Sequence, residues 1–253
     1  MIARTESEKT ALREGGALLA SILREVAALV HPGISTAELD LAAGKKITEA
    51  GAVSAFLNYQ PEGATHPYPA VLCTSINDEV VHGVPSKERV LKEGDIMSLD
   101  LGLSYEGYFL DHAVTVPVGK VSAESAQLIE ATREALDAAV AAARPGGHTG
   151  DIGAAVGPVA KKYGYAVVKD LGGHGVGKAV HEKPFIENIG NAGEGVKFEL
   201  GMVLALEPMF ALGQGDITFD EDGYTCRTRD GSRAAHFEHT VLLTESGAEI
   251  LTQ

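Results

Sequence analysis

The sequence predicts a mixed α/β (α+β) fold in which two similar halves each contribute two helices followed by strands. The first observation is a repeat: residues 32–39 resemble residues 145–152, displaced by 113 positions, and Gly51 falls on Gly164 at the same displacement. The second observation is a match between residues 92–100 and 199–207, which puts Asp100 on Glu207. Chance is the alternative, but two collinear matches that include an acid favour duplication. We expect one domain, residues 1–253, with pseudo-twofold halves at about 8–120 and 121–253.

Helices are expected before and after each Pro-Gly pair. Ser35 and Glu38 form a capping box that starts one helix, and Thr149 is the expected N-cap of the equivalent helix in the second half. The helices that precede the two Pro-Gly pairs each have one apolar face. Their apolar residues are Leu18, Leu19, Ile22, Leu23, Val26, Leu29 and Val30 in the first and Leu128, Ile129, Ala135, Leu136 and Val140 in the second.

Strands are expected to follow the helices in each half. The apolar runs 96–101 and 108–114 enclose residues 102–107 and predict a β-hairpin. The runs 203–206 and 237–243 predict further buried strands. Residues 60–70 contain three prolines and one glycine, and therefore predict a loop.

Composition limits the class of protein. A net charge of −14 gives no electrostatic support for binding to nucleic acid or to an anionic membrane surface. The two cysteines, Cys73 and Cys226, suit a reducing compartment and argue against a disulfide framework. No apolar run is long enough for a membrane span, and the polar N-terminus lacks a signal core. We expect a cytoplasmic protein that itself binds neither membrane nor nucleic acid.

Four acidic residues lie in or beside the expected strands: Asp100, Asp111, Glu207 and Glu238. A buried carboxylate costs on the order of several kcal/mol unless a cation or strong donors compensate it, and Asp is disfavoured inside strands. With His174, these acids balance the charge of two divalent cations, and their oxygens suit manganese, iron(II), cobalt or magnesium. Two such cations can activate a shared water towards a carbonyl, so the residues predict a two-metal hydrolase.

Two other interpretations explain less. Asp100 and Asp111 alone can share a proton across the hairpin, but His174, Glu207 and Glu238 then have no explanation. Residues 172–178 have the spacing of a phosphate-binding P-loop. However, the residue that follows is Ala179 instead of Ser or Thr, and Pro184 interrupts the helix that a P-loop requires.

Taken together, these segments resemble the type I methionine aminopeptidases of bacteria, a family with the pita-bread fold. The resemblance covers residues 8–252, with motifs at 75–77, 82–85, 173–177, 181–182, 207–209 and 237–240 besides the hairpin acids. It implies a curved antiparallel sheet around a catalytic site that holds two divalent cations: cobalt, manganese, iron(II) or zinc. The implied metal ligands are Asp100, Asp111, His174, Glu207 and Glu238, with Asp111 and Glu238 bridging both cations.

The resemblance also assigns catalytic and substrate-binding residues. His82 would contact the scissile amide, His181 would bind the carbonyl oxygen, and Glu207 would carry a proton. Tyr59, Tyr68 and Cys73 match positions that line the methionine pocket, although Cys73 is equally an ordinary core residue. Tyr224 stands where the family has Trp at the pocket rim.

The sequence departs from the family pattern at other positions near the expected site. His112 replaces Thr, Val180 replaces an aromatic residue, and the loop at 60–66 is longer than usual. His236 replaces Gln two residues before Glu238. If strand alternation holds there, His236 faces the same way as Glu238 and can support the metal ligands; the alternative is a solvent-facing residue near the site mouth.

The function that we expect is removal of the initiator methionine from nascent proteins with a small second residue. The enzyme would be a monomeric metal-dependent aminopeptidase, with the ribosome as a potential place of action. One alternative is an Xaa-Pro peptidase of the same fold, but these usually carry an extra N-terminal domain for which 253 residues leave no room. The other is an inactive binding relative, which would be expected to have lost metal ligands.

Overall fold

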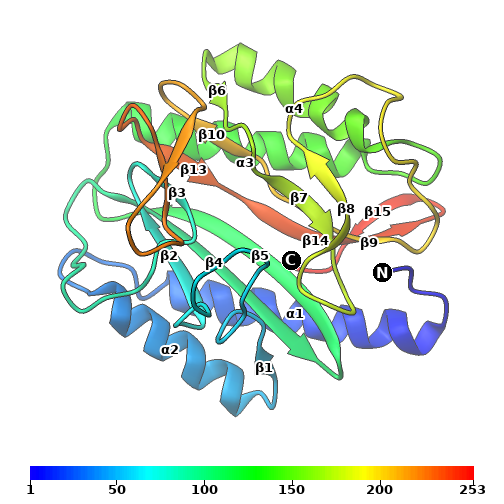
Figure 1. Ribbon diagram of the computed structural model, residues 1–253, viewed down its shortest axis with the longest axis horizontal. Coiled ribbons are helices and arrows are strands. Elements are labelled where there is room, and N and C mark those ends of the chain that lie inside the picture. The colour runs from blue at the N-terminus through cyan, green and yellow to red at the C-terminus, as the bar shows by residue number, and fades with distance from the viewer.

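The computed structural model describes residues 1–253 and contains a curled antiparallel sheet of nine strands with four helices (Figure 1). The helices are α1 (Glu6–Ala27), α2 (Thr36–Glu49), α3 (Ala123–Ala142) and α4 (Thr149–Tyr163). The large sheet contains β1 (Val53–Ser54), β2 (Leu72–Ile76), β4 (Ile96–Tyr105), β5 (Tyr108–Pro117), β7 (Gly172–Gly175), β8 (Glu182–Glu187), β9 (Val203–Leu206), β14 (Glu238–Thr244) and β15 (Gly247–Ile250). Two three-stranded sheets are formed by β6 (Ala166–Val167), β10 (Met209–Ala211) and β13 (Ala234–His236), and by β3 (Glu79–Val81), β11 (Ile217–Phe219) and β12 (Cys226–Thr228).

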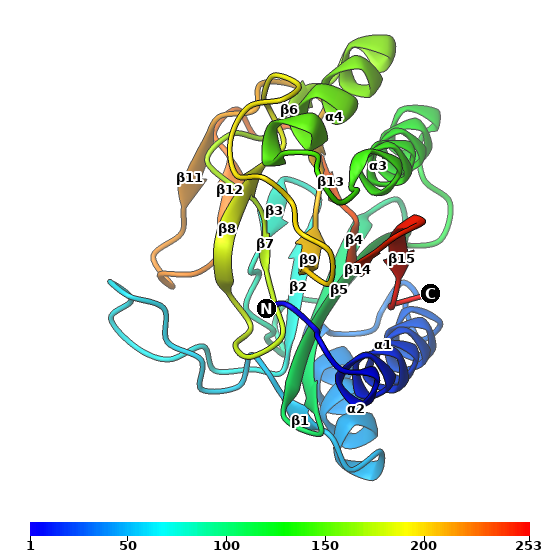
Figure 2. The same cartoon turned by 90° about the vertical axis from the view of Figure 1, so that its right-hand side faces the viewer.

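The two halves of the chain meet at the centre of the large sheet. Its order is β1-β4-β5-β14-β9-β7-β8, so β5 of the first half pairs with β14 of the second. The helices α1, α2 and α3 lie on one side of this sheet, whereas β11 and β12 lie on the other (Figure 2). The predicted mixed α/β fold with an antiparallel sheet is confirmed. None of the helices is long and apolar enough to cross a bilayer.

The chain has two main hydrophobic cores, one formed mainly by the first half and the other mainly by the second. In the first, Leu19 and Leu23 of α1 pack in one fully buried cluster with Leu101 of β4. In the second, Leu128 and Leu136 of α3 belong to a separate cluster with Leu204 and Leu206 of β9. A core strand that is packed in this way tolerates an acid only where its carboxylate has polar or charged partners.

Corresponding hydrogen bonds recur at the two displacements that the sequence suggested. The Gly33 N–H donates to Leu91 O at 2.8 Å, and the Gly146 N–H donates to Phe198 O at 2.9 Å. Similarly, the Thr36 N–H donates to Arg89 O and the Thr149 N–H to Val196 O, both at 2.9 Å. We propose that the chain is one domain of two pseudo-symmetric halves, with bounds at about 8–120 and 121–253.

Two local predictions were wrong. The N-cap of α4 is His148, whose backbone N–H donates to Asp151 Oδ2 at 2.8 Å, so Thr149 is instead the first helical residue. The repeat explains the difference, because Ser35, the N-cap of α2, falls on His148 at a displacement of 113. In addition, α1 ends at Ala27, which leaves Leu29 outside the helix and 41% exposed.

Candidate active site and metal centre

The hairpin brings its two acids onto one face of the sheet. In the β4–β5 register Asp111 lies opposite Gly102, which is two residues along the strand from Asp100. Residues two apart on a strand face the same way, so the two carboxylates are diagonal neighbours. Asp100 is 8% exposed and Asp111 is 3% exposed. Ordinary turn capping does not account for them, because the turn is at Glu106–Gly107.

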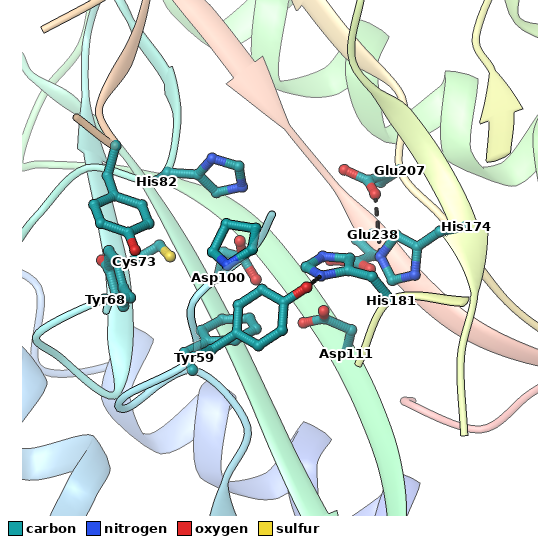
Figure 3. Close-up of a pocket in the computed structure, with 13 residues that line it drawn as sticks. Tyr59, Tyr68, Cys73, His82, Asp100, Asp111, His174, His181, Glu207 and Glu238 are labelled. Carbon is teal, nitrogen blue, oxygen red and sulfur yellow. Dashed lines mark hydrogen bonds and ion pairs between the residues drawn. The ribbon is translucent and has the colours of Figure 1, made fainter. Parts of the chain in front are cut away.

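The second half supplies three further side chains from neighbouring strands. Glu238 opens β14 and pairs with Ala113 of β5, which itself pairs with Asp100 of β4 and lies two residues from Asp111. Glu207 directly follows β9, and His174 on β7 pairs with Ala205 of β9. All five side chains point towards the same space (Figure 3).

Potential ligand atoms of these residues form two overlapping groups. In each group the atoms lie within 4.8 Å of one another: Asp100, Asp111 and Glu238 in one, and His174, Glu207 and Glu238 in the other. Glu238 is common to both, so one carboxylate can serve two adjacent cations. A third group of the same size contains Asp111, His174 and His181. His181 was predicted to bind substrate, and its position beside two predicted ligands is compatible with that role.

The electrostatics of the cluster are those of a cation site. Burial raises the pKa of Asp100 to about 6 and the pKa values of Asp111, Glu207 and Glu238 well above the ordinary carboxyl range. Repulsion from neighbouring carboxylates adds to this at Asp111 and Glu238. Asp100 Oδ1 and Glu238 Oε1 are buried without a hydrogen-bond partner. Unpartnered buried carboxylate oxygens that converge in this way fit divalent cations, which take oxygen ligands.

His174 has the protonation state that a metal ligand needs. Burial lowers its pKa to about 3, so the imidazole is neutral at physiological pH. Its Nδ1 lies 2.9 Å from Gly175 O, which fixes the ring, while Nε2 faces Glu207 Oε1 at 3.5 Å. A backbone partner on one ring nitrogen commonly orients the other towards a metal.

A pocket of about 160 Å³ opens directly onto the cluster. Of its thirteen lining residues, eleven were predicted as site residues: Tyr59, Tyr68, Cys73, His82, Asp100, Asp111, His174, His181, Glu207, Tyr224 and Glu238. The other two, Phe56 and Pro61, were missed. The aromatic and sulfur groups form an apolar wall that faces the carboxylates (Figure 3).

Tyr59 connects this apolar wall to His181. The Tyr59 hydroxyl lies 2.9 Å from His181 Nδ1, and the two rings are 5.2 Å apart. His181 also meets the His174 ring edge-on at 4.5 Å. Burial against these groups lowers the pKa of His181, which therefore stays neutral at pH 7. The sequence offered no signal for this contact, because Tyr59 lies in a loop 122 residues away.

His82 is held in an unusual backbone conformation beside a buried ion cluster. Its φ is +60°, a region that non-glycine residues seldom occupy and that often marks functional sites. At Gly83 a Cβ would lie 2.2 Å from Thr74 O, so only glycine fits after His82. Glu79, which is 5% exposed, accepts from Arg227 Nη2 at 2.8 Å and also pairs with Arg89. These contacts fix the strand β3 that leads into His82.

His236 is not a solvent-facing residue. It is 1% exposed, its Nε2 lies 3.5 Å from Glu207 Oε2, and neither ring nitrogen has a hydrogen-bond partner. Strand alternation with Glu238 does not apply, because Phe237 separates β13 from β14. The alternative of a solvent-facing His236 is therefore wrong, and its nearest acid is Glu207. We propose that His236 supports Glu207.

The other departures from the family pattern lie around the site. His112 stacks on His239 at 4.9 Å, and neither residue lines the pocket. Val180 is buried with the aromatic wall, where Tyr224 meets Tyr68 edge-on at 5.1 Å.

The P-loop interpretation is excluded. Residues 172–175 form a strand and the next element is strand β8, so no helix follows the glycines.

Comparison with known proteins places the chain in a family. Residues 10–245 match the model of metallopeptidase family M24. The chain is 47% identical over 255 residues to the methionine aminopeptidase of Aquifex aeolicus, covering 100% of this chain and 98% of that protein. It is 42% identical to methionine aminopeptidase 1 of Mycobacterium tuberculosis, covering 98% of this chain and 94% of that one.

Solved structures give the same relationship. The methionine aminopeptidase of Thermotoga maritima superposes with a TM-score of 0.94 at 41% identity, with full coverage of both chains. The prolidase of Pyrococcus furiosus has a TM-score of 0.76 at 24% identity, and the match covers 65% of its chain, which is a likeness of fold alone. The chain belongs to the methionine aminopeptidases of metallopeptidase family M24. It is therefore a metal-dependent exopeptidase, as predicted.

Proposed function

We propose that this enzyme removes the N-terminal methionine from polypeptides whose second residue is small. The observation that carries the proposal is one pocket whose walls are an apolar aromatic surface and a cluster of four carboxylates and a histidine. The apolar wall suits a thioether side chain, and the acids suit cations beside a free amino group. The sequence relatives named methionine aminopeptidase support the same conclusion.

The five clustered residues Asp100, Asp111, His174, Glu207 and Glu238 would hold two divalent cations. When bound, such cations polarise a peptide carbonyl and make water a nucleophile at neutral pH. Glu207 would take a proton from the attacking water and return it to the leaving amine, a task that its place in both the carboxylate cluster and the pocket wall allows.

Tyr59 would determine which ring nitrogen of His181 carries the proton. If the Tyr59 hydroxyl donates to Nδ1 of the neutral ring, the remaining proton of His181 is on Nε2. His181 Nε2–H would then donate to the carbonyl oxygen as negative charge develops there. His82, whose pKa burial lowers to about 4, would stay neutral and align the scissile amide.

Alanine at His82 or His181 should slow the chemical step and leave metal binding nearly intact. Loss of one such donor typically costs about 10²–10³-fold in kcat. Calorimetric metal titration and kcat would be measured on each variant, with His31→Ala as the control because His31 is exposed and outside the pocket. Lost metal stoichiometry would make that histidine a metal ligand. Unchanged turnover per folded molecule would limit it to a packing role.

The pocket should accept norleucine and reject bulky second residues. A hydrophobic pocket separates side chains that differ by one methylene by only about 1–3 kcal/mol. A second side chain must lie against His82, His181 and Glu207, the catalytic wall that the methionine pocket shares with the neighbouring cavity. Rates of release of the first residue from Met-Ala-Ser, Met-Leu-Ser and norleucyl-Ala-Ser test this. Equal rates for Met-Leu-Ser and Met-Ala-Ser would show that this wall does not select the second residue by size.

The function itself is tested by two substrates and metal analysis. Purified holoenzyme should cleave Met-Ala-Ser, leave Ala-Pro intact, and contain divalent metal. Cleavage of Ala-Pro in preference would indicate an Xaa-Pro peptidase, and metal-containing protein that cleaves neither peptide would indicate a binding protein.

We further propose that the enzyme acts as a monomer in the cytoplasm on N-termini of nascent chains, with the ribosome as a potential docking partner. Both cysteines are free and buried, which supports a reducing compartment. Gel filtration and ribosome cosedimentation test these two points.

A further inference from the structure

We propose that a groove along β8 binds the substrate residues downstream of the scissile bond and selects an apolar third residue through Phe185. The inference rests on the proposed aminopeptidase function and deepens it. In an exopeptidase with this site, the part of the bound substrate that follows its first residues must extend beyond the catalytic groups. Three adjoining cavities form a continuous space in which it can lie.

The first step leads from the methionine pocket across the catalytic groups. A second cavity, of about 380 Å³, shares His82, His174, His181 and Glu207 with the pocket but none of its aromatic residues. It therefore lies beyond the catalytic groups from the methionine side. Its further walls include Leu171, Met209 and Phe185. A peptide whose first side chain fills the apolar pocket would place its next residues here.

The second step leads away from the catalytic groups along the strand. A third cavity, of about 460 Å³, shares Asp170, Leu171 and Phe185 with the second. The shared residues make the two cavities one continuous groove, which ends at Asn188 and Ile189. Phe185 lies on both parts and is therefore its central side chain.

The strand β8 presents alternate side chains to this groove. Pro184 and Ile186 are buried, whereas Lys183, Phe185 and Glu187 are exposed. Strand residues rise about 3.3 Å each, so the wall from Lys183 to Glu187 spans about 13 Å, enough for about four extended residues. A polypeptide that reaches the site in extended form would therefore be contacted well beyond its second residue.

Apolar contact, rather than charge, should dominate selection in the groove. Lys169 and Lys183 are offset there by Asp170 and Glu187, and Glu182 pairs with the N-terminal ammonium of Met1 at 2.9 Å, so the wall has no single sign of charge. Phe185 is 53% exposed and Ile189 is 48% exposed, which leaves apolar area free for a ligand. An aromatic or large aliphatic side chain at the third position would cover part of Phe185.

The test compares peptides that differ only at the third residue. For the wild-type holoenzyme, kcat/KM for Met-Ala-Phe-Ser should exceed that for Met-Ala-Gly-Ser by about 3- to 10-fold, the range for partial burial of an aromatic side chain. Phe185→Ser should reduce this ratio to near one, and Phe185→Leu should keep most of it. Leu41→Ala, which removes a 74% exposed residue from α2, is the control and should leave the ratio unchanged.

The outcomes separate this inference from the function on which it rests. Methionine release without any third-residue preference, or a preference that survives in Phe185→Ser, would overturn the groove and leave the aminopeptidase function intact. Release from none of the methionyl peptides would overturn the function itself. Thermal unfolding of each variant excludes misfolding as the cause of a lost preference, and the Phe185→Leu variant gives an independent reading of the same ratio.

Discussion

Asp111→Asn is expected to abolish methionine release and, at the same time, to stabilise the metal-free protein. Asp111 belongs to one proposed cation group and also lies within 4.8 Å of His174, a member of the other, so its loss should weaken both proposed cation positions. We expect kcat/KM to fall by at least about 10³-fold, because the loss of even one electrostatic partner in an active site costs about 10²–10³-fold. In the metal-free protein burial raises the pKa of Asp111, so folding at neutral pH requires this group to take up a proton that the unfolded chain has released. The amide removes that cost, so the melting temperature should rise.

Loss of activity together with a higher melting temperature of the metal-free protein distinguishes a metal ligand from a structural residue. Glu106→Gln is the matched control, since Glu106 lies in the exposed turn of the same hairpin. It should change neither activity nor melting temperature by much. An Asp111→Asn variant that is inactive and also less stable without metal would instead assign Asp111 a structural role.

Removal of the metal is expected to make stability depend on pH between pH 7 and 9. Burial raises the pKa values of Asp111, Glu207 and Glu238, so the folded metal-free protein holds protons that the unfolded chain releases. A group with a raised pKa stabilises the fold below its unfolded pKa and loses that stabilisation as pH rises through its folded pKa. Metal-free protein should therefore be less stable at pH 9 than at pH 7.

Each carboxyl that is protonated in the folded chain and ionised in the unfolded chain changes the stability by at most about 1.4 kcal/mol per pH unit. The comparison is made above pH 7 because the buried histidines have the opposite effect: they make stability rise with pH. For a histidine such as His174, with a pKa lowered to about 3, that effect is confined to lower pH. Bound metal should flatten the dependence, since the cations keep the carboxylates ionised. Melting curves at both pH values, with and without metal, measure this. A metal-free protein as stable at pH 9 as at pH 7 would contradict the buried-acid description.

The chemistry of the site was more predictable from sequence than its geometry. Asp100, Asp111, Glu207 and Glu238 were detectable because each acid interrupts an apolar strand pattern, and such an interruption needs a compensating partner. The repeat predicted that Asp100 and Glu207 occupy equivalent places in the two halves.

What the sequence left undetermined depends on contacts between distant segments. The Tyr59–His181 hydrogen bond joins two loops, and loop conformation has no periodic pattern from which it can be read. His236 was ambiguous because it is the last residue of its strand and Phe237 separates that strand from β14, so alternation could not decide which way His236 faces. The ion cluster of Glu79 was missed because acids and arginines are common on surfaces, and only the fold brings Arg227 next to it.

The most direct test of the account is methionine release from Met-Ala-Ser by protein stripped of metal, measured before and after Mn²⁺ is returned. The account predicts no release from the stripped protein, recovery with added Mn²⁺, and no recovery in Asp111→Asn. Undiminished release by protein in which elemental analysis detects no metal would contradict it.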